Sequence, residues 1–276
     1  MNQENCCVVT CDMPLDQTYW DNQYQSETTG WDLGDVSPPI KSYVDAIKNK
    51  EIAILIPGCG NSYEAAYLLE QGFTNITVID IASTLVHHLK LKFENNKNIK
   101  IILGDFFEHQ GVYDLIIEQT FFCALPPSLR QKYVWKMAQL LSKKGKLSGL
   151  LFNREFEVSP PFGGNQTEYE HLFKNAFIYN NLFVPNNSVE KRQGHELFME
   201  FSKNETIVTL YQFEGITCNG CMTTVSNKFQ EIDGVMNVSM SSDFSEILIV
   251  SATEVELPVL QHVISYDDKY KITKIS

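Results

Sequence analysis

The strongest constraint on the fold is an alternation of short apolar runs with helix-length segments between residues 50 and 152. Each apolar run has the length of a buried parallel strand. The runs lie at 52–56, 76–80, 99–103, 113–118 and 146–152. A first helix is expected through 65–69 and ends at Gly72. A second follows the strand at 76–80 and extends to about residue 93. A third spans about 128–141 and is stopped by Lys143-Lys144-Gly145. Because strands that alternate with helices pair in parallel, the sequence predicts a doubly wound α/β sheet.

The pattern is interrupted once, by a polar segment at 202–205, and then begins again. Before it, a helix at about 167–175 and strands at 177–184 and 194–202 complete the first part. After it come strands at 207–213, 235–241, 246–251 and 270–275, with helices at about 221–230 and 256–263. This βαββαβ order predicts a small α+β domain of ferredoxin-like fold. We therefore expect a loose tail over 1–15, a first domain over 16–203 and a second domain over 206–276.

Charge and cysteine content exclude several classes of protein. The formal net charge of −12 opposes binding to nucleic acid and to anionic membranes. The first ten residues lack the basic and apolar regions of a signal peptide, and no apolar run approaches the roughly 18 residues that span a bilayer. Seven cysteines at irregular spacing do not suggest a disulfide framework. We expect a cytoplasmic protein with neither nucleic-acid nor membrane partners.

Glycines, carboxylates and an aromatic residue follow three of the predicted strands, at the ends where open parallel sheets bind ligands. Gly58 and Gly60 follow the first strand and allow close approach of the backbone to a ligand. Asp80 ends the second strand, where a carboxylate can accept hydrogen bonds from a ribose diol. After the third strand, Asp105 offers a carboxylate to an exocyclic amine and Phe106 an aromatic wall to a base.

The fourth strand end brings Gln119 to the same crevice. The Gly58-x-Gly60 pair lacks the third glycine of a dinucleotide-binding motif, because Tyr63 stands there. This argues against NAD, and so against an oxidoreductase, and favours a ligand without phosphates such as S-adenosylmethionine. Either aspartate taken singly could be a helix cap, but four successive strand ends together favour a binding site.

Residues from about 20 to 201 resemble the thiopurine methyltransferase family and, within it, the thiol and halide methyltransferases. The most specific segment is Thr-Phe-Phe-Cys-Ala-Leu-Pro-Pro at 120–127, followed by Arg130. The other matching segments are Gly-Trp-Asp-Leu-Gly at 30–34 with Pro38 beyond, Ile-Pro-Gly-Cys-Gly at 56–60, Val-Ile-Asp-Ile at 78–81, Gly-Asp-Phe-Phe at 104–107 and Tyr-Asp-Leu-Ile at 113–116. The resemblance implies a class I fold of seven strands, the last antiparallel, with S-adenosylmethionine as methyl donor.

The same resemblance implies roles for individual residues. Trp20 and Trp31 would lie against the donor as a lid, and Gly58 and Gly60 would lie beside its methionyl part. Asp80 would hold the ribose, and Asp105 with Phe106 the adenine. Arg130 would face the acceptor. Where relatives often have Asp-Tyr after the fourth strand, this chain has Glu118-Gln119. Where they often have Gly-Pro-Pro-aromatic, it has Ser-Pro-Pro-Phe at 159–162. Both segments lie near the acceptor in the family, so the acceptor stays open.

Two cysteines of the second predicted domain, Cys218 and Cys221, lie in the segment Gly-Ile-Thr-Cys-Asn-Gly-Cys at 215–221. In a βαββαβ unit this segment resembles the heavy-metal-associated domain, which implies a soft metal ion bound by the two thiolates. Cu(I) suits such a pair, and Zn(II) would need added ligands. A redox dithiol and an inert remnant are the alternatives. Cys6, Cys7 and Cys11 are interpreted as exposed free thiols, with a metal-handling tail as the alternative.

Two functions follow. The first is an S-adenosylmethionine-dependent methyltransferase that acts on a small thiol, thiopurine-like, halide or metalloid acceptor and carries a soft-metal-binding domain. The alternative is a metal-trafficking or metal-sensing protein with a degenerate methyltransferase domain, whose partner would donate or accept the metal. Retention of both Asp80 and Asp105 favours the first function, since a degenerate domain need not keep them.

Overall fold

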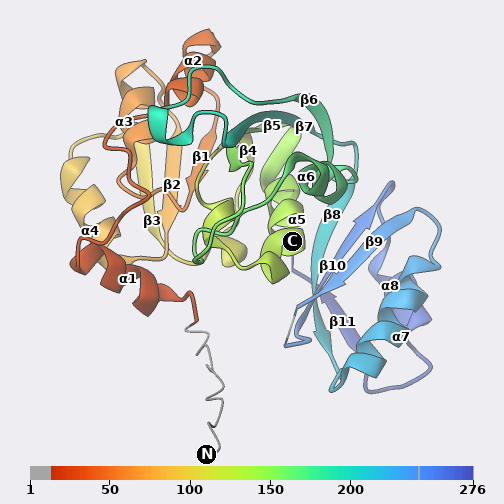
Figure 1. Cartoon of the computed structure of the whole chain (residues 1–276). Coiled ribbons are helices and arrows are strands. Elements are labelled where there is room, and N and C mark those ends of the chain that lie inside the picture. Colours follow the sequence, from red (N-terminus) through yellow and green to blue (C-terminus); the bar gives the residue numbers. More distant parts are fainter. Residues whose placement is uncertain (1–13, 242, 276) are drawn as a thin grey trace, which may run out of the picture.

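The computed structural model describes residues 14–241 and 243–275, and its centre is a seven-stranded sheet of order β3-β2-β1-β4-β5-β7-β6 (Figure 1). The strands are β1 (Ile54–Pro57), β2 (Ile76–Asp80), β3 (Ile99–Leu103), β4 (Tyr113–Gln119), β5 (Leu141–Phe152), β6 (Phe177–Phe183) and β7 (Glu196–Lys203). The first five pair in parallel, and β7 is antiparallel to both β5 and β6. The seven strands and the antiparallel last one confirm the prediction.

Helices cover both faces of this sheet, which is why every residue of β1 and β2 is buried. The helices are α1 (Gln17–Gln25), α2 (Pro38–Ala46), α3 (Tyr63–Glu70), α4 (Ser83–Lys92), α5 (Arg130–Leu140) and α6 (Gln166–Phe173). Side chains of α2, α3 and α4 form one apolar core with the sheet, and those of α5 and α6 form another. Four short 3-10 turns are η1 (Phe106–Glu108), η2 (Phe122–Ala124), η3 (Pro127–Leu129) and η4 (Glu190–Arg192).

The prediction differs from the structure at the start of β5. Lys143-Lys144-Gly145 was expected to stop a helix before a strand at 146, but the helix ends at Leu140 and β5 begins at Leu141. The register of β5 on β4 shifts between the pairs Tyr113–Leu141 and Leu115–Lys146. An irregular strand of this kind accommodates extra residues without leaving the sheet, so the basic segment lies within the strand.

The described residues after β7 form a second sheet, of order β11-β8-β10-β9, with antiparallel pairing between its strands. We refer to residues 207–275 as the C-terminal module. Its elements are β8 (Ile207–Glu214), α7 (Asn219–Gln230), β9 (Val235–Met240), β10 (Glu246–Ser251), α8 (Leu257–Val263) and β11 (Lys271–Lys274). Assignment of the module to the ferredoxin-like fold, and the domain boundaries, stay predictions.

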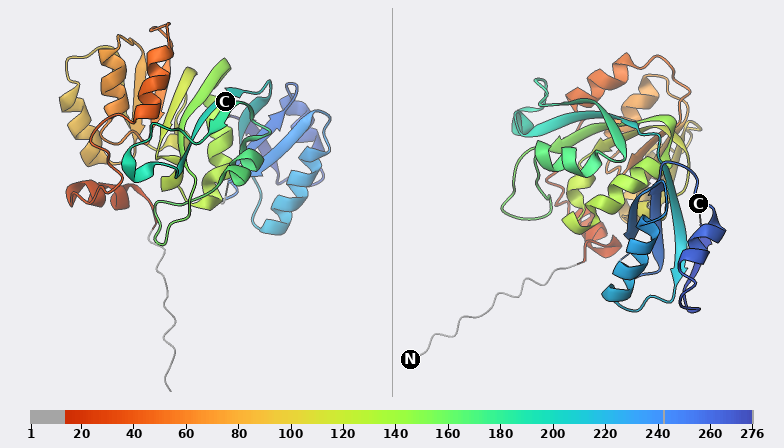
Figure 2. Two further views of the ribbon diagram at one scale, coloured as in Figure 1. Left: turned by 45° about the horizontal axis from the view of Figure 1, so that its top comes forward. Right: turned by 90° about the vertical axis from the view of Figure 1, so that its right-hand side faces the viewer.

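The sheet of the C-terminal module has two apolar faces. Because side chains alternate along a strand, Tyr211 and Phe213 of β8 point to a core that α7 and α8 cover. Leu248 and Val250 of β10 point the other way and join the core that contains α5. Helix α5 therefore lies between the two sheets (Figures 1 and 2). Over the described ranges, no helix is both long and apolar enough to cross a membrane.

Candidate cofactor site and a separate thiol pair

A cavity of about 860 Å³ opens at the carboxyl ends of the parallel strands and beneath α1. The eight residues predicted to bind the cofactor all line it. They are Trp20, Trp31, Gly58, Gly60, Asp80, Asp105, Phe106 and Gln119. These residues come from three strand ends, η1 and the N-terminal segment, so the fold brings together residues that are about 100 positions apart in the sequence.

Asp80 is buried at the end of β2. Its carboxylate accepts hydrogen bonds from the backbone N–H groups of Gly60, at 3.2 Å, and Ala82, at 3.0 Å. Burial raises the pKa of Asp80 from 3.8 to about 6, and these hydrogen bonds offset part of the rise. A carboxylate has room for about four hydrogen bonds, so Asp80 keeps acceptor capacity for a ligand.

The turn after β1 needs its two glycines. Gly58 and Gly60 have φ angles of +54° and +49°, a region that disfavours residues with a side chain. A Cβ atom at Gly58 would lie 2.2 Å from Cδ2 of the Phe121 ring. The backbone here therefore forms a close wall of the cavity that a larger residue would disrupt.

The turn η1 places an acidic and an aromatic residue side by side. Asp105 caps the turn, with Oδ1 accepting a hydrogen bond from the Phe107 N–H at 2.8 Å. Phe106 is buried and packs edge-on against Phe121, with 5.2 Å between ring centres. The cavity at this end has a flat apolar wall beside a carboxylate, which suits a purine base with an exocyclic amine.

Helix α1 brings aromatic side chains over the cavity. Trp20 and Trp31 meet edge-on with their ring centres 5.6 Å apart. Asp21 anchors the helix, because its carboxylate accepts hydrogen bonds from Ser83 Oγ, at 2.6 Å, and from the Thr84 N–H, at 2.8 Å, at the start of α4. Neither α1 nor this anchor was predicted from the apolar pattern, because none of the nine residues of α1 is buried.

Glu118 and Gln119, at the end of β4, have different surroundings. Glu118 is fully buried and accepts hydrogen bonds from the backbone N–H groups of Phe121 and Phe122 and from the Tyr133 hydroxyl. Burial raises the pKa of Glu118 to about 7. Gln119 lines the cavity, and its buried Oε1 finds no hydrogen-bond partner among the described residues. An unpaired buried acceptor of this kind suits a ligand that donates a hydrogen bond.

Arg130, for which the resemblance implied a position facing the acceptor, does not line the cavity. Its guanidinium pairs with the Glu168 carboxylate, donates to the Gly163 carbonyl at 2.6 Å and lies over the Phe122 ring. Because the buried guanidinium is bonded to these partners, Arg130 stabilises the loop before α6 and does not extend into the cavity.

Several charged residues that line the cavity were not predicted. Arg192 is buried, donates to the Trp31 carbonyl at 2.9 Å and lies 3.9 Å from the Glu196 carboxylate. Glu64 is also buried, and its burial raises its pKa to about 7. Further cavity-lining residues are Arg154, Lys191 and His195. No sequence motif marks these residues. They lie in loops or near the starts of helices, and only folding of the chain brings them to the cavity.

Cys59 and Cys123 also line the cavity, and both are buried. Burial raises the pKa of each thiol, and the Cys123 thiol donates a hydrogen bond to the Thr120 carbonyl at 3.1 Å. Because the thiolate is the nucleophilic form, this environment opposes a catalytic role for either cysteine.

Cys218 and Cys221 lie away from the cavity, where β8 leads into α7. Their sulfur atoms are 3.0 Å apart, and Cys218 is exposed. The hydrogen bond between the two thiols and the one that the Cys221 backbone N–H donates to Cys218 Sγ lower the pKa of Cys218, which occupies the N-cap position of α7. Within 14–241 and 243–275, no group of three or more His, Cys, Asp and Glu residues is arranged to hold a metal ion. Cys6, Cys7 and Cys11 lie outside the described residues.

Comparison with known proteins places the first part of the chain in one family. The thiopurine S-methyltransferase family model matches residues 15–209. "Probable thiol methyltransferase 2" of Arabidopsis thaliana is 30% identical over 198 residues, which cover 68% of this chain and 85% of the relative. "Thiopurine S-methyltransferase" of Vibrio vulnificus (strain YJ016) is 26% identical over 206 residues, which cover 67% and 95%.

A solved structure shows the same fold. The 1,6-didemethyltoxoflavin-N1-methyltransferase of Burkholderia thailandensis, solved with bound 1,6-didemethyltoxoflavin and S-adenosylhomocysteine, aligns with a TM-score of 0.56 at 17% identity. The alignment covers 68% of this chain and 87% of that one. The seven-stranded sheet is thus a class I methyltransferase fold, and most of the C-terminal module lies beyond the family match. The chain belongs to the thiopurine S-methyltransferase family and is an S-adenosylmethionine-dependent methyltransferase.

Proposed function

We propose that this methyltransferase acts on a small soft nucleophile, either a thiol or thiopurine-like compound or a halide or metalloid anion. The observation that carries the methyl-transfer activity is the convergence of eight predicted donor-binding residues on one cavity. The donor, S-adenosylmethionine, supplies an activated methyl group when it is bound. The protein then needs chiefly to align the acceptor and to exclude water. The names of the relatives, thiol and thiopurine methyltransferases, support this class of acceptor.

The residues of the cavity fit such a donor. Asp80 has the remaining acceptor capacity that a ribose diol requires, and Gln119 Oε1 is a buried acceptor with no partner in the part of the chain that the structure describes. Asp105 and Phe106 suit the exocyclic amine and the face of an adenine. The edge-on pair of Trp20 and Trp31 would exclude water from the reacting atoms.

Carboxylates line the cavity, among them the two assigned to the donor, but basic side chains line it as well and could receive an anionic acceptor. Arg192 is buried close to Trp31, and Arg154, Lys191 and His195 also line the cavity. A cation in a place with little water attracts a thiolate or halide more strongly than it would in solvent. Since Cys59 and Cys123 are held as thiols, the acceptor itself provides the nucleophile.

Calorimetric titration with S-adenosylhomocysteine, followed by transfer of a labelled methyl group to a panel of acceptors, tests this proposal. We expect micromolar binding and transfer to one or more thiols, thiopurines, halides or metalloid anions. Transfer confined to nitrogen or oxygen acceptors would contradict the acceptor class. Absence of S-adenosylhomocysteine binding would contradict the proposed cofactor site.

Binding of S-adenosylhomocysteine is expected to weaken in acid because Asp80 becomes protonated. With a pKa of about 6, Asp80 is ionised at pH 7.5 and protonated at pH 5, where it accepts hydrogen bonds less well. A group of this kind gives about a tenfold loss of affinity between those pH values. Its folded pKa is above the ordinary 3.8, so protonation of Asp80 stabilises the folded state as pH falls through about 6. Titrations at both pH values check the prediction, and Asp80→Asn should abolish this dependence.

We further propose that the C-terminal module is a heavy-metal-associated domain of ferredoxin-like fold that binds a soft metal through Cys218 and Cys221. The order β8-α7-β9-β10-α8-β11 and the antiparallel sheet support the fold. Two sulfur atoms 3.0 Å apart, with Cys218 exposed, support the metal site. The described residues add no third ligand, so Cu(I) suits the pair better than Zn(II). A protein that donates or accepts the metal would meet it at the exposed Cys218.

Replacing both Cys218 and Cys221 with serine is expected to remove one equivalent of bound Cu(I), because hydroxyl groups are poor ligands for a soft ion. The variant should be made in a chain in which Cys6, Cys7 and Cys11 are already serine, so that those thiols do not compete. Thr223→Ser, on the same helix, is the control and should bind as the parent does. Undiminished Cu(I) binding by the double variant, measured by competition with a chromogenic chelator, would show that the site is elsewhere.

A further inference from the structure

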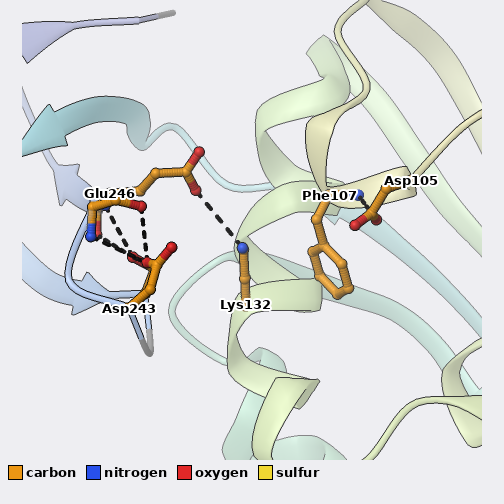
Figure 3. Close-up of polar contacts among 7 residues, drawn as sticks. Asp105, Phe107, Lys132, Asp243 and Glu246 are labelled. Atoms are coloured by element: carbon orange, nitrogen blue, oxygen red, sulfur yellow. Dashed lines mark hydrogen bonds and ion pairs between the residues drawn. The ribbon is translucent and has the colours of Figure 1, made fainter. Parts of the chain in front are cut away.

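Lys132 of α5 connects the C-terminal module to a wall of the cofactor cavity. Its Nζ lies 3.7 Å from Oε2 of Glu246, the first residue of β10. The same Nζ lies over the ring of Phe107, 5.1 Å from the ring centre. Figure 3 shows the Lys132 side chain between Glu246 and Phe107. One ammonium group therefore contacts an anion of one sheet and an aromatic ring beside the other.

The backbone that carries Glu246 is held firmly. Asp243 Oδ1 accepts hydrogen bonds from Ser241 Oγ at 2.6 Å, from the Ser245 N–H at 3.1 Å and from Ser245 Oγ at 2.8 Å (Figure 3). The Glu246 N–H donates in turn to Ser241 Oγ at 2.9 Å. These bonds connect Ser241, Asp243, Ser245 and Glu246, so the residue whose carboxylate approaches Lys132 is itself hydrogen-bonded through its backbone.

Phe107 belongs to the turn that shapes one end of the cavity. Its N–H is the donor that Asp105 accepts, and its ring meets that of Phe106 with 5.4 Å between the centres. All three residues line the cavity. A shift of the Phe107 ring would therefore move the carboxylate and the aromatic wall assigned to the adenine.

Apolar and charged groups surround the same contact. The Phe107 ring, Val208 and Leu210 all pack against the core that holds Leu248 and Val250. Lys136, one turn along α5, is buried, and burial lowers its pKa to about 8. Three carboxylates attract this ammonium, those of Glu246 in the module and of Asp105 and Glu108 at η1, and Lys132 repels it. The module and the cavity wall thus share both a core and a set of charges.

We propose that Lys132 and Glu246 are positioning residues for the cofactor site, so that the C-terminal module contributes to donor binding without touching the donor. The ion pair with Glu246 positions the Lys132 ammonium, and this ammonium contacts the Phe107 ring. Phe107 in turn stabilises the turn that carries Asp105 and Phe106. This proposal rests on the proposed S-adenosylmethionine site. It gives the module a role in the reaction that does not depend on whether the thiols carry a metal.

The test uses the full chain with Lys132→Gln, Glu246→Gln and the double variant, and compares their affinity for S-adenosylhomocysteine. Each single change is expected to raise Kd about threefold, the scale of a partly exposed ion pair and a cation–π contact. KM for S-adenosylmethionine should rise equally while kcat stays within about twofold, since ground state and transition state lose the same contact. Because both residues act through one contact, the double variant should weaken binding little more than either single variant.

Two controls separate positioning from a general loss of structure. Lys132→Arg keeps a cation between the carboxylate and the ring and should restore affinity to within about 1.5-fold of the parent. Glu254→Gln breaks an exposed ion pair with Lys274 in the same module, away from the cavity, and should leave Kd unchanged. If the parent binds S-adenosylhomocysteine and Lys132→Gln and Glu246→Gln bind it equally well, positioning is wrong. If the parent does not bind it, the proposed cofactor site is wrong.

Discussion

Asp80→Ala is expected to weaken binding of S-adenosylhomocysteine by about 1–3 kcal/mol, or roughly five- to 150-fold. The carboxylate stands at the end of β2 in the cavity, and its remaining acceptor capacity is the proposed anchor for the ribose. Alanine removes that acceptor and leaves the ribose hydroxyls without a buried partner. Calorimetric titration at pH 7.5, where Asp80 is ionised in the parent protein, measures the loss.

A matched control for this substitution is Asp114→Ala. Asp114 lies in β4 of the same sheet and accepts a hydrogen bond from the Ala53 N–H at 3.1 Å, but it does not line the cavity. It should bind S-adenosylhomocysteine as the parent does, even if its stability changes. Equal affinity of Asp80→Ala and the parent would show that the ribose is held elsewhere.

Glu118→Ala is expected to lower the free energy of unfolding by about 3–5 kcal/mol, because three buried donors lose their acceptor at a cost of about 1–3 kcal/mol each. Glu118 is fully buried, and the substitution leaves three donors without an acceptor, namely the N–H groups of Phe121 and Phe122 and the Tyr133 hydroxyl. The turn that these bonds hold includes Thr120, whose φ of +61° is unfavourable for a β-branched residue. Denaturant-induced unfolding measures the change.

Glu118→Gln separates loss of hydrogen bonds from loss of volume at this position. Its amide oxygen can still accept from the two backbone donors, while its NH₂ group faces the Tyr133 hydroxyl. We expect it to lose less than half of what alanine loses. If both variants unfold at the same denaturant concentration as the parent, then the Glu118 network does not contribute to stability as its burial indicates.

Much of the first domain could be predicted because its signals are local. Continuous apolar runs specify buried parallel strands, and a glycine pair or an aspartate directly after a run lies at the edge where ligands bind. Gly58, Gly60, Asp80 and Asp105 were predicted in this way, and all four line the cavity. The resemblance added Trp20 and Trp31, which the apolar pattern could not identify because α1 buries no residue in the core.

Other placements depend on pairing between distant segments. The resemblance implied that Arg130 faces the acceptor, but its partners are Glu168 of α6 and the Gly163 carbonyl of the loop before α6, whose path the motif does not specify. Arg192 reaches the cavity from η4, after an irregular segment without periodicity. The ion pair between Lys132 and Glu246 exists only because the C-terminal module docks on α5.

The position of α5 between the two sheets has a consequence for the dynamics of the molecule. A helix on the outside of a doubly wound sheet keeps one face in water and can open locally by leaving one surface. Eight of the eleven residues of α5 are buried, and two sheets hold them. Opening α5 requires both sheets to part, so its local opening approaches the free energy of global unfolding. The helix that carries Lys132 thus belongs to the slowest-moving part of the enzyme, whereas α1, which buries no residue and is attached to α4 through Asp21, opens at a lower cost in free energy.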